Sequence, residues 1–367
     1  MQPAHPLDAV THPDPYPYYA ALASARPLYR DAALDLWVAS HPDTITAVLR
    51  HPAARVRPAA EPVPRGLCPG PAGELFGRFV RMNDGALHAR LKDLLAAFIR
   101  EQGLQPSPPA WPRAAPLDAA CVDRYLAAAP VHAQAALLGL PSAVHADCAA
   151  DISAFLSALP AAAGADRVAA GHAAAERLQG RLESHLAGPR ASPALRRLGS
   201  DAEQAGIAPA LLAANLAGLL FQSCEAGAGL LGNALILAGR RGVPAALTPE
   251  GAQALIDDVV RHDPPLHNTR RFLAGPIDIG GQRIEAGQTV LLVLAAAAVI
   301  QPDAGWTFGA QRHACPGGDA ARRHAAGALA HLLRAGVDAA ALAARFRFRP
   351  LPNARVPQFD FSEDNTP

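Results

Sequence analysis

The chain has 367 residues, of which 50% are hydrophobic and only 18% are charged, so it can bury a sizeable core and disorder is not expected. Its 33 basic and 32 acidic residues give a formal charge of +1, which argues against a protein that binds nucleic acid through bulk positive charge. These proportions are typical of a globular protein.

The cysteines and the N-terminal segment indicate in which cellular compartment the protein works. The five cysteines are widely spaced and include no C-x-x-C pair, which excludes a disulfide scaffold and a structural zinc module and is typical of a reducing compartment. The chain begins MQPAHPLDAVTHPDPYPYY, which has neither a basic start nor an apolar stretch. We therefore expect no signal peptide or anchor, and a cytoplasmic location.

The first regular pattern along the chain is a short β-like run at 28–41. Between 118 and 260, Ala and Leu recur at a spacing of three to four residues with Pro or Gly as punctuation, which predicts a series of helices. Within it, the only formal charge from Ala208 to Gly239 is Glu225, but polar residues are interspersed and aromatic residues are lacking at the ends. This pattern favours a buried helix over a membrane span.

A second β-like region at 269–294 contains Gly280-Gly281, which predicts a hairpin turn between alternating apolar residues. A final helix is expected from about 318 to 335, followed by a polar tail. No repeat and no long linker divides the chain. We therefore expect one mainly α domain with small β-sheets over residues 1–367.

The chemistry is concentrated in residues 306–333, WTFGAQRHACPGGDAARRHAAGALAHLL. A Phe-Gly turn leads through His313 to Cys315, just before the predicted helix. The helix dipole and nearby backbone N–H groups stabilise a thiolate at such a position, and the thiolate is the form that ligates metals. One Cys without a second soft ligand suggests a metal whose other positions a cofactor fills, as in haem iron held by one thiolate. The alternative is an ordinary Cys buried at a loop–helix junction.

This segment resembles the haem-ligand loop of the cytochromes P-450, F-G-x-G-x-H-x-C-x-G followed by A-R in the next helix. The matching residues are Phe308, Gly309, His313, Cys315, Gly317, Ala321 and Arg322. The resemblance implies haem b (iron protoporphyrin IX) with Cys315 as the axial metal ligand and with Phe308 and Gly317 beside the cofactor. Gln311 stands where the family has its second Gly, so we expect an altered backbone or a shifted β-bulge there.

Residues 256–272, IDDVVRHDPPLHNTRRF, resemble the family's E-x-x-R helix and the strand that follows it. Arg261 is the motif's arginine, and Asp258 replaces the glutamate with a side chain one methylene shorter. We expect these two residues to form an ion pair, with Arg261 in the core.

Residues 82–98, MNDGALHARLKDLLAAF, resemble the helix whose H-x-x-x-R pair holds a haem propionate. His88 and Lys92 occupy those positions, one helical turn apart on one face. By the same resemblance, Arg271 and His313 hold propionates as well. Each side chain taken alone is an ordinary surface charge, and their joint occurrence points to haem contacts.

Residues 216–239, LAGLLFQSCEAGAGLLGNALILAG, resemble the distal helix that crosses the haem, whose motif is A-G-x-[DE]-T. Glu225 occupies the acid position and Ala226 stands where the family has Thr, whose hydroxyl helps to hold iron-bound oxygen and to relay protons. The resemblance makes Glu225 and Ala226 the catalytic positions, with Glu225 delivering protons through water or a substrate hydroxyl. The alternative is an ordinary buried helix with one satisfied Glu.

Only residues 301–306, QPDAGW, separate the apolar run at 291–300 from the Phe-Gly turn. The family has a longer meander here, which covers the thiolate side where electron-donor proteins dock. The shortened meander puts the docking of the family's usual electron donors in doubt. Arg312, Arg322 and Arg323 still offer a basic patch on the thiolate side.

The resemblance extends over nearly the whole chain and implies the cytochrome P-450 fold, with haem between a distal and a proximal helix. It implies a haem-thiolate monooxygenase of bacterial secondary metabolism, acting on an apolar or neutral small molecule that is free or tethered to a carrier protein. A ferredoxin and its reductase would supply electrons; no nucleic-acid or membrane partner is expected. Two alternatives stay open: an atypical haem-thiolate enzyme (peroxygenase, oxidative coupling catalyst, isomerase or dehydratase), and a degenerate haem-binding homologue.

Overall fold

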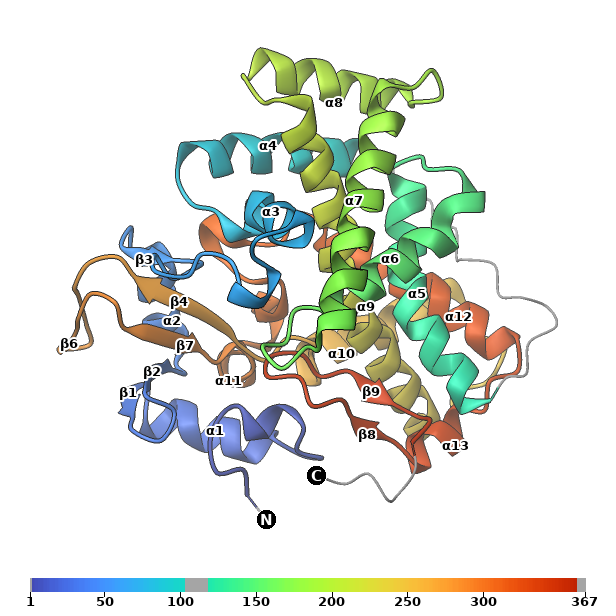
Figure 1. Cartoon of the computed structure of the whole chain (residues 1–367). Coiled ribbons are helices and arrows are strands. Elements are labelled where there is room, and N and C mark those ends of the chain that lie inside the picture. The colour runs from blue at the N-terminus through green and yellow to red at the C-terminus, as the bar shows by residue number, and fades with distance from the viewer. Residues whose placement is uncertain (1, 103–117, 362–367) are drawn as a thin grey trace. The chain divides into compact units, whose positions relative to one another are not determined.

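The computed structural model describes residues 2–102 and 118–361, which form two compact units (Figure 1). The first unit comprises Met1–Ala54, Pro106–Ala129 and Glu225–Pro367, and the second comprises Arg55–Gln105 and Pro130–Cys224. Two helices contain residues of both units, α5 (Ala119–Leu137) and α9 (Pro209–Arg241). The single domain expected over 1–367 stays a prediction.

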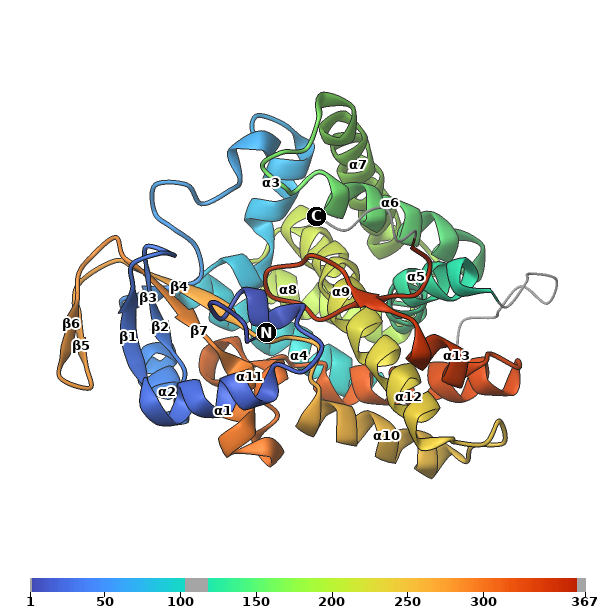
Figure 2. The ribbon, with the colours of Figure 1, turned by 90° about the horizontal axis from the view of Figure 1, so that it is seen from below.

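A five-stranded sheet organises the first unit and can be followed in Figure 2. Its strands, in spatial order, are β1 (Leu28–Asp31), β2 (Leu36–Ala39), β7 (Thr289–Leu292), β4 (Thr269–Leu273) and β3 (Ala54–Arg55). β2 pairs in parallel with β7, and Val38 lies opposite Leu291. β4 runs antiparallel to β7. The predicted β regions at 28–41 and 269–294 are therefore confirmed.

Helices cover both faces of this sheet because successive side chains of a strand point to opposite sides. Val38 and Leu291 share a core with α1 (Tyr16–Ala25). Trp37 and Val290 share a second core with α2 (Pro42–Arg50). α11 (Leu294–Ile300) follows β7, contributes alanines to both cores and contacts α1.

Two small hairpins complete the strands. β5 (Ile277–Ile279) and β6 (Gln282–Ile284) are joined by Gly280 and Gly281, with φ of +57° and +74°. A two-residue turn with positive φ at both positions is the type that fits the twist of a hairpin, so the sequence prediction is confirmed. β8 (Arg347–Phe348) pairs with β9 (Pro357–Gln358).

Three more helices of the first unit pack around the C-terminal half of α9. They are α10 (Pro249–His262), α12 (Gly318–Arg334) and α13 (Ala339–Ala344). α10 begins where the Thr248 hydroxyl accepts the Gly251 N–H, a standard N-terminal cap. The helix expected at 318–335 is confirmed. The polar tail expected after it is wrong, because Phe348, Val356 and Phe359 are buried in the core.

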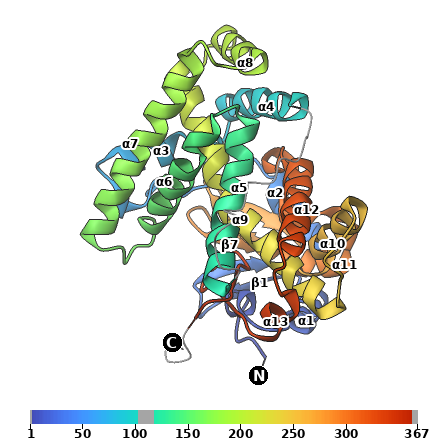
Figure 3. The same cartoon turned by 90° about the vertical axis from the view of Figure 1, so that its right-hand side faces the viewer.

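The second unit is helical, and Figure 3 shows its paired helices α6 and α7. Its helices, apart from α5 and α9, are α3 (Pro71–Arg78), α4 (Ala86–Glu101), α6 (His145–Ser157), α7 (Ala165–Ala187) and α8 (Pro193–Gln204). Phe79, Phe155 and Phe221 form an aromatic cluster with ring centroids 5.1 to 6.1 Å apart. Buried Asp151 on α6 forms ion pairs with Arg177 and Arg181 on α7. The helices predicted over 118–260 are confirmed.

Seven short 3-10 turns connect these elements in the described ranges: η1 (Asp8–Val10), η2 (Arg65–Leu67), η3 (Val80–Met82), η4 (Ser142–Val144), η5 (Pro302–Ala304), η6 (Trp306–Phe308) and η7 (Gln311–His313). Among the described helices, α9 is long and apolar enough to cross a membrane by length and composition, and 67% of its apolar window is buried. That burial agrees with the predicted buried helix. The fold class, mainly α with small sheets, is confirmed.

Candidate functional site

Cys315 lies at the end of a tight loop in the first unit, between η7 and the start of α12. Its backbone N–H donates to the Phe308 carbonyl oxygen at 2.7 Å, which closes the loop. The side chain is exposed, and Sγ accepts the N–H of Gly317 at 3.4 Å. An accessible sulfur with a backbone donor and a helix start beside it favours negative charge on that sulfur.

The loop depends on two residues with positive φ. Gly309 has φ of +69°, and a Cβ there would lie 3.3 Å from the His313 carbonyl oxygen, so glycine fits this position best. Gln311 has φ of +58°, in the left-handed region that glycine favours. The expected alteration of the backbone is therefore wrong: the chain adopts a glycine-type conformation at Gln311, and the residue bears the strain.

Two arginines hold the loop in place. Arg322 of α12 stacks over the Phe308 ring, with its guanidinium carbon 5.1 Å from the ring centroid. Arg312 donates to the carbonyl oxygen of Leu49, in the last turn of α2, at 2.9 Å. It also donates to the carbonyl oxygen of Ala54, which lies beyond the end of α2. Arg312 therefore has a structural role in place of the expected role in a basic docking patch. The sequence does not predict this role, because the oxygen atoms that accept from Arg312 belong to backbone more than 250 positions away.

Arg271 and His313 belong to the same unit as Cys315. Arg271 is buried at 5% exposure on β4, opposite Val290 of β7, and its guanidinium donates to the Arg270 carbonyl oxygen at 2.8 Å. His313 is half-buried in η7. A guanidinium offers several N–H donors in a plane, a geometry that suits a carboxylate such as a haem propionate.

Glu225 and Ala226 lie in the middle of α9, where the helix is accessible. From Leu212 to Ile236 every residue is buried except Leu219, Gln222, Ser223, Glu225, Ala226 and Gly227. Accessible surface thus concentrates on the turns where the sequence predicts the distal site. The small side chains at 226 and 227 leave room for a ligand or cofactor over these turns.

His88 and Lys92 belong to α4 of the second unit. His88 is buried at 4% exposure, and Lys92, one turn further along, is half-buried. Their shared helix face is as expected, and their contact with haem propionates stays a prediction.

The Asp258–Arg261 ion pair forms as expected, at 3.8 Å, but it is not the shortest contact of either residue. Arg261 is 46% exposed, and its Nε lies 2.8 Å from the Asp303 carboxylate in η5, against 3.8 Å from its guanidinium to Asp258. Asp258 also pairs with Arg241 of α9, at the shorter distance of 2.7 Å. The expected location of Arg261 in the core is wrong, because the short connection between α11 and η6 supplies a nearer acid at the surface.

These residues fit a haem on three counts. The sulfur of Cys315 is accessible and has a backbone donor, Arg271 is a buried cation, and the middle of α9 is open. Within the described ranges, no three His, Cys, Asp or Glu side chains cluster closely enough to hold a metal ion. A cofactor that brings its own four nitrogen ligands needs only one thiolate from the protein, so the donor set matches haem iron.

Comparison with known proteins identifies the fold. No family model matches the sequence, and no curated protein sequence matches it. Among solved structures, epothilone D-bound cytochrome P450epoK is similar with a TM-score of 0.75 at 18% identity, covering 99% of this chain and 100% of that one.

Two further structures are similar. P450BioI, in complex with an acyl carrier protein ligated to hexadec-9Z-enoic acid, gives a TM-score of 0.70 at 18% identity, covering 95% of this chain and 98% of that one. CxnD, a cytochrome P450 for C–S bond formation in chuangxinmycin biosynthesis, gives 0.68 at 20% identity, covering 95% and 94%. The chain therefore has the cytochrome P450 fold.

Proposed function

We propose that the protein is a haem-thiolate oxidoreductase in which Cys315 is the axial ligand of haem b, and that it acts as a monooxygenase. The observation that carries the proposal is the geometry at Cys315: an accessible Sγ, a Gly317 N–H directed at it, and α12 beginning three residues later. The P450 fold around this loop supports the same reading.

When bound, haem supplies oxidising chemistry that protein side chains lack. Cys315 would hold the iron through its thiolate and supply electron density to it, and the Gly317 N–H, which already donates to the sulfur, would moderate that charge. Arg271 and His313, with His88 and Lys92 from α4, would hold the propionates through charge-assisted hydrogen bonds. Phe308 packs the loop against α12 and keeps the sulfur in place.

Proton delivery is assigned to Glu225. Ala226, next to it, has no hydroxyl, so a water molecule or a substrate hydroxyl would complete the relay between the carboxyl group and the reacting atoms. The partial exposure of both residues on the open turns of α9 supports this assignment.

The substrate is proposed to be an apolar or neutral small molecule, since the accessible turns of α9 carry one formal charge, that of Glu225. Delivery on a carrier protein is a further proposal, supported by the similarity to P450BioI, whose structure contains an acyl carrier protein. A ferredoxin and its reductase are the proposed electron donors, and the cytoplasm is the proposed location.

A second candidate is an atypical haem-thiolate enzyme that works without ordinary oxygen activation. Ala226 in place of a hydroxyl residue favours it, as does the short connection in which only η5 separates α11 from η6. One similar structure, CxnD, is that of a cytochrome P450 enzyme for C–S bond formation.

A comparison of oxidants separates the candidates. The haem-loaded protein is incubated with molecules that shift its Soret band, either with NADPH, ferredoxin and reductase or with hydrogen peroxide alone. Turnover that needs the reductase system supports the monooxygenase, and turnover with peroxide or with neither oxidant supports the atypical enzyme. No turnover under any condition would leave a haem-binding homologue and overturn the enzyme proposal.

A further inference from the structure

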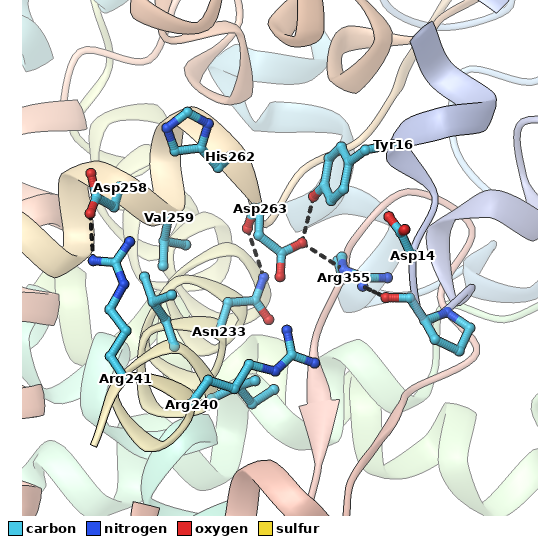
Figure 4. A pocket seen from close by; sticks show the side chains of 13 residues that line it. Asp14, Tyr16, Asn233, Arg240, Arg241, Asp258, Val259, His262, Asp263 and Arg355 are labelled. Atoms are coloured by element: carbon cyan, nitrogen blue, oxygen red, sulfur yellow. Dashed lines mark hydrogen bonds and ion pairs between the residues drawn. The ribbon is translucent and has the colours of Figure 1, made fainter. Parts of the chain in front are cut away.

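A pocket of about 540 Å³ lies in the first unit, apart from every residue assigned to the haem (Figure 4). Four segments line it: the chain before and at the start of α1, the last turns of α9, the end of α10, and the chain before β9. Its volume lies within the range of pockets that hold small molecules.

In one wall of the pocket, the charged side chains hydrogen-bond to one another and to backbone. The Asp263 carboxylate accepts from the Tyr16 hydroxyl at 2.5 Å and from Arg355 Nε at 2.8 Å. Burial, and next the charge of Asp263, raise the pKa of Tyr16, so its hydroxyl stays protonated and donates. Arg355, 2% exposed, also donates to three backbone carbonyl oxygens, those of Val10, His12 and Pro13. This wall needs no ligand.

Asn233 does need one. It is 1% exposed, and its Nδ2 donates to the Asp263 carbonyl oxygen at 2.9 Å, which fixes which end of the amide is oxygen. Its Oδ1 is buried and accepts no hydrogen bond from the residues that the structure describes. A buried acceptor without a donor is unfavourable, so this atom points to a ligand that brings an O–H or N–H group.

Arg240 supplies the second recognition element. It follows Asn233 by two helical turns, with Ile236 and Leu237 between them on the same face of α9. Its neighbour Arg241 is paired with Asp258, whereas no carboxylate within the described ranges lies at ion-pair distance from Arg240. Arg240 and Asn233 both line the pocket, and both side chains are drawn in Figure 4.

We propose that this pocket binds a small hydroxy acid or amino acid with an apolar side chain. The carboxylate binds Arg240, the hydroxyl or ammonium group donates to Asn233 Oδ1, and the apolar group lies against Ile236 and Leu237. The proposal does not depend on haem, because none of these residues is assigned to it.

Isothermal titration of the full-length protein with 2-hydroxy-4-methylpentanoate tests the proposal. We expect saturable binding at one site, at least about five-fold weaker binding of 4-methylpentanoate, which lacks the donor, and weaker binding of 4-methyl-1-pentanol, which lacks the carboxylate. Arg240→Gln should weaken binding of the hydroxy acid about ten-fold or more, the loss expected for one charge-assisted hydrogen bond. Arg240→Lys should retain part of it.

Arg334→Gln is the matched control, because Arg334 is an exposed helix-end arginine that does not line the pocket. It should bind the hydroxy acid as the unmodified protein does. Arg240 is exposed as well, so its variants are expected to fold, and thermal melts check this. The proposal is overturned if neither the hydroxy acid nor L-leucine binds saturably in the millimolar range. Equal binding by Arg240→Gln, which would place the ligand elsewhere, overturns it too.

Discussion

Cys315 owes its position to the residues on both sides of it. Gly309 permits the turn that lets the Cys315 N–H reach the Phe308 carbonyl oxygen, and Gly317 brings its own N–H to the sulfur. Gln311 lies in a conformation that costs an ordinary residue roughly 1–2 kcal/mol. The loop thus keeps its shape at the expense of stability, as sites of chemistry often do.

Replacing the strained residue should stabilise the protein. Gln311→Gly removes the Cβ from a left-handed position and should raise the free energy of unfolding by about 1 kcal/mol. Ala310→Gly is the control, because φ of −144° there is ordinary extended backbone and glycine should lower stability by roughly 0.5–1 kcal/mol. Denaturant titration checks both. A loss of stability in Gln311→Gly would mean that its side chain makes contacts worth more than the strain.

His267 makes stability depend on pH. Burial, and next the charge of Arg355, lower the pKa of its imidazole well below the ordinary value, so the folded protein holds it neutral. The unfolded chain takes up the proton first as pH falls below about 6.5, so stability should decline there by at most about 1.4 kcal/mol per pH unit from this group.

Denaturant titrations between about pH 7 and pH 5 measure that decline. His267→Gln should flatten it, whereas His262→Gln, at an exposed position, should not. An unchanged slope in His267→Gln would assign the effect to other groups.

The helix α9 contributes residues to both of the proposed sites. Its middle turns expose Glu225 and Ala226, and its last turns present Asn233 and Arg240 to the separate pocket. Buried residues, which form the core with α10 and α12, occupy the stretch between them. Glu225 and Arg240 lie where packing leaves the helix accessible, whereas Asn233 is buried in the pocket wall.

A hydroxyl at residue 226 should change how oxidant is used. Ala226→Thr places a hydrogen-bond donor on an accessible turn at a helix-propensity cost of about 0.7 kcal/mol or less, so the fold and haem binding should persist. We expect a larger fraction of the NADPH consumed to appear as product. Ala226→Val, which matches the shape without the hydroxyl, is the control. Equal coupling in the two variants would mean that residue 226 does not contact the reacting atoms.

Two aspartates of one helix end should respond differently to truncation. Asp258→Ala should cost less than about 1 kcal/mol, because its partners are half-exposed and Arg261 keeps Asp303. Asp263→Ala should cost about 3 kcal/mol or more, because it leaves the buried guanidinium of Arg355 without its acid. Thermal and denaturant unfolding compare them. Equal losses would contradict this division between surface and buried pairs.

The sequence predicts the parts of the fold that depend on local chemistry. The Gly280-Gly281 turn, the start of α12 and the Cys315 loop follow from residues within a few positions of one another. Contacts between side chains and residues far away in the sequence could not be predicted. Arg312, for example, donates to backbone at the end of α2, a contact that depends on how two distant segments pack together.

The burial of the C-terminal segment could not be predicted for a related reason. Its Phe348, Val356 and Phe359 are dispersed among arginines and prolines, so no apolar period marks them as core. The P450 fold persists at 18 to 20% identity to the solved structures compared with it, since a core tolerates extensive substitution when its volume and apolar pattern are kept.

The central claim is that Cys315 holds haem through its thiolate, and the absorption spectrum of the dithionite-reduced protein with carbon monoxide tests it most directly. We predict the long-wavelength Soret band for which the cytochromes P450 are named, and its loss in Cys315→Ala, which should still fold because the side chain is exposed. A band at the position of histidine-ligated haem, no haem uptake, or an unchanged band in Cys315→Ala would contradict the claim.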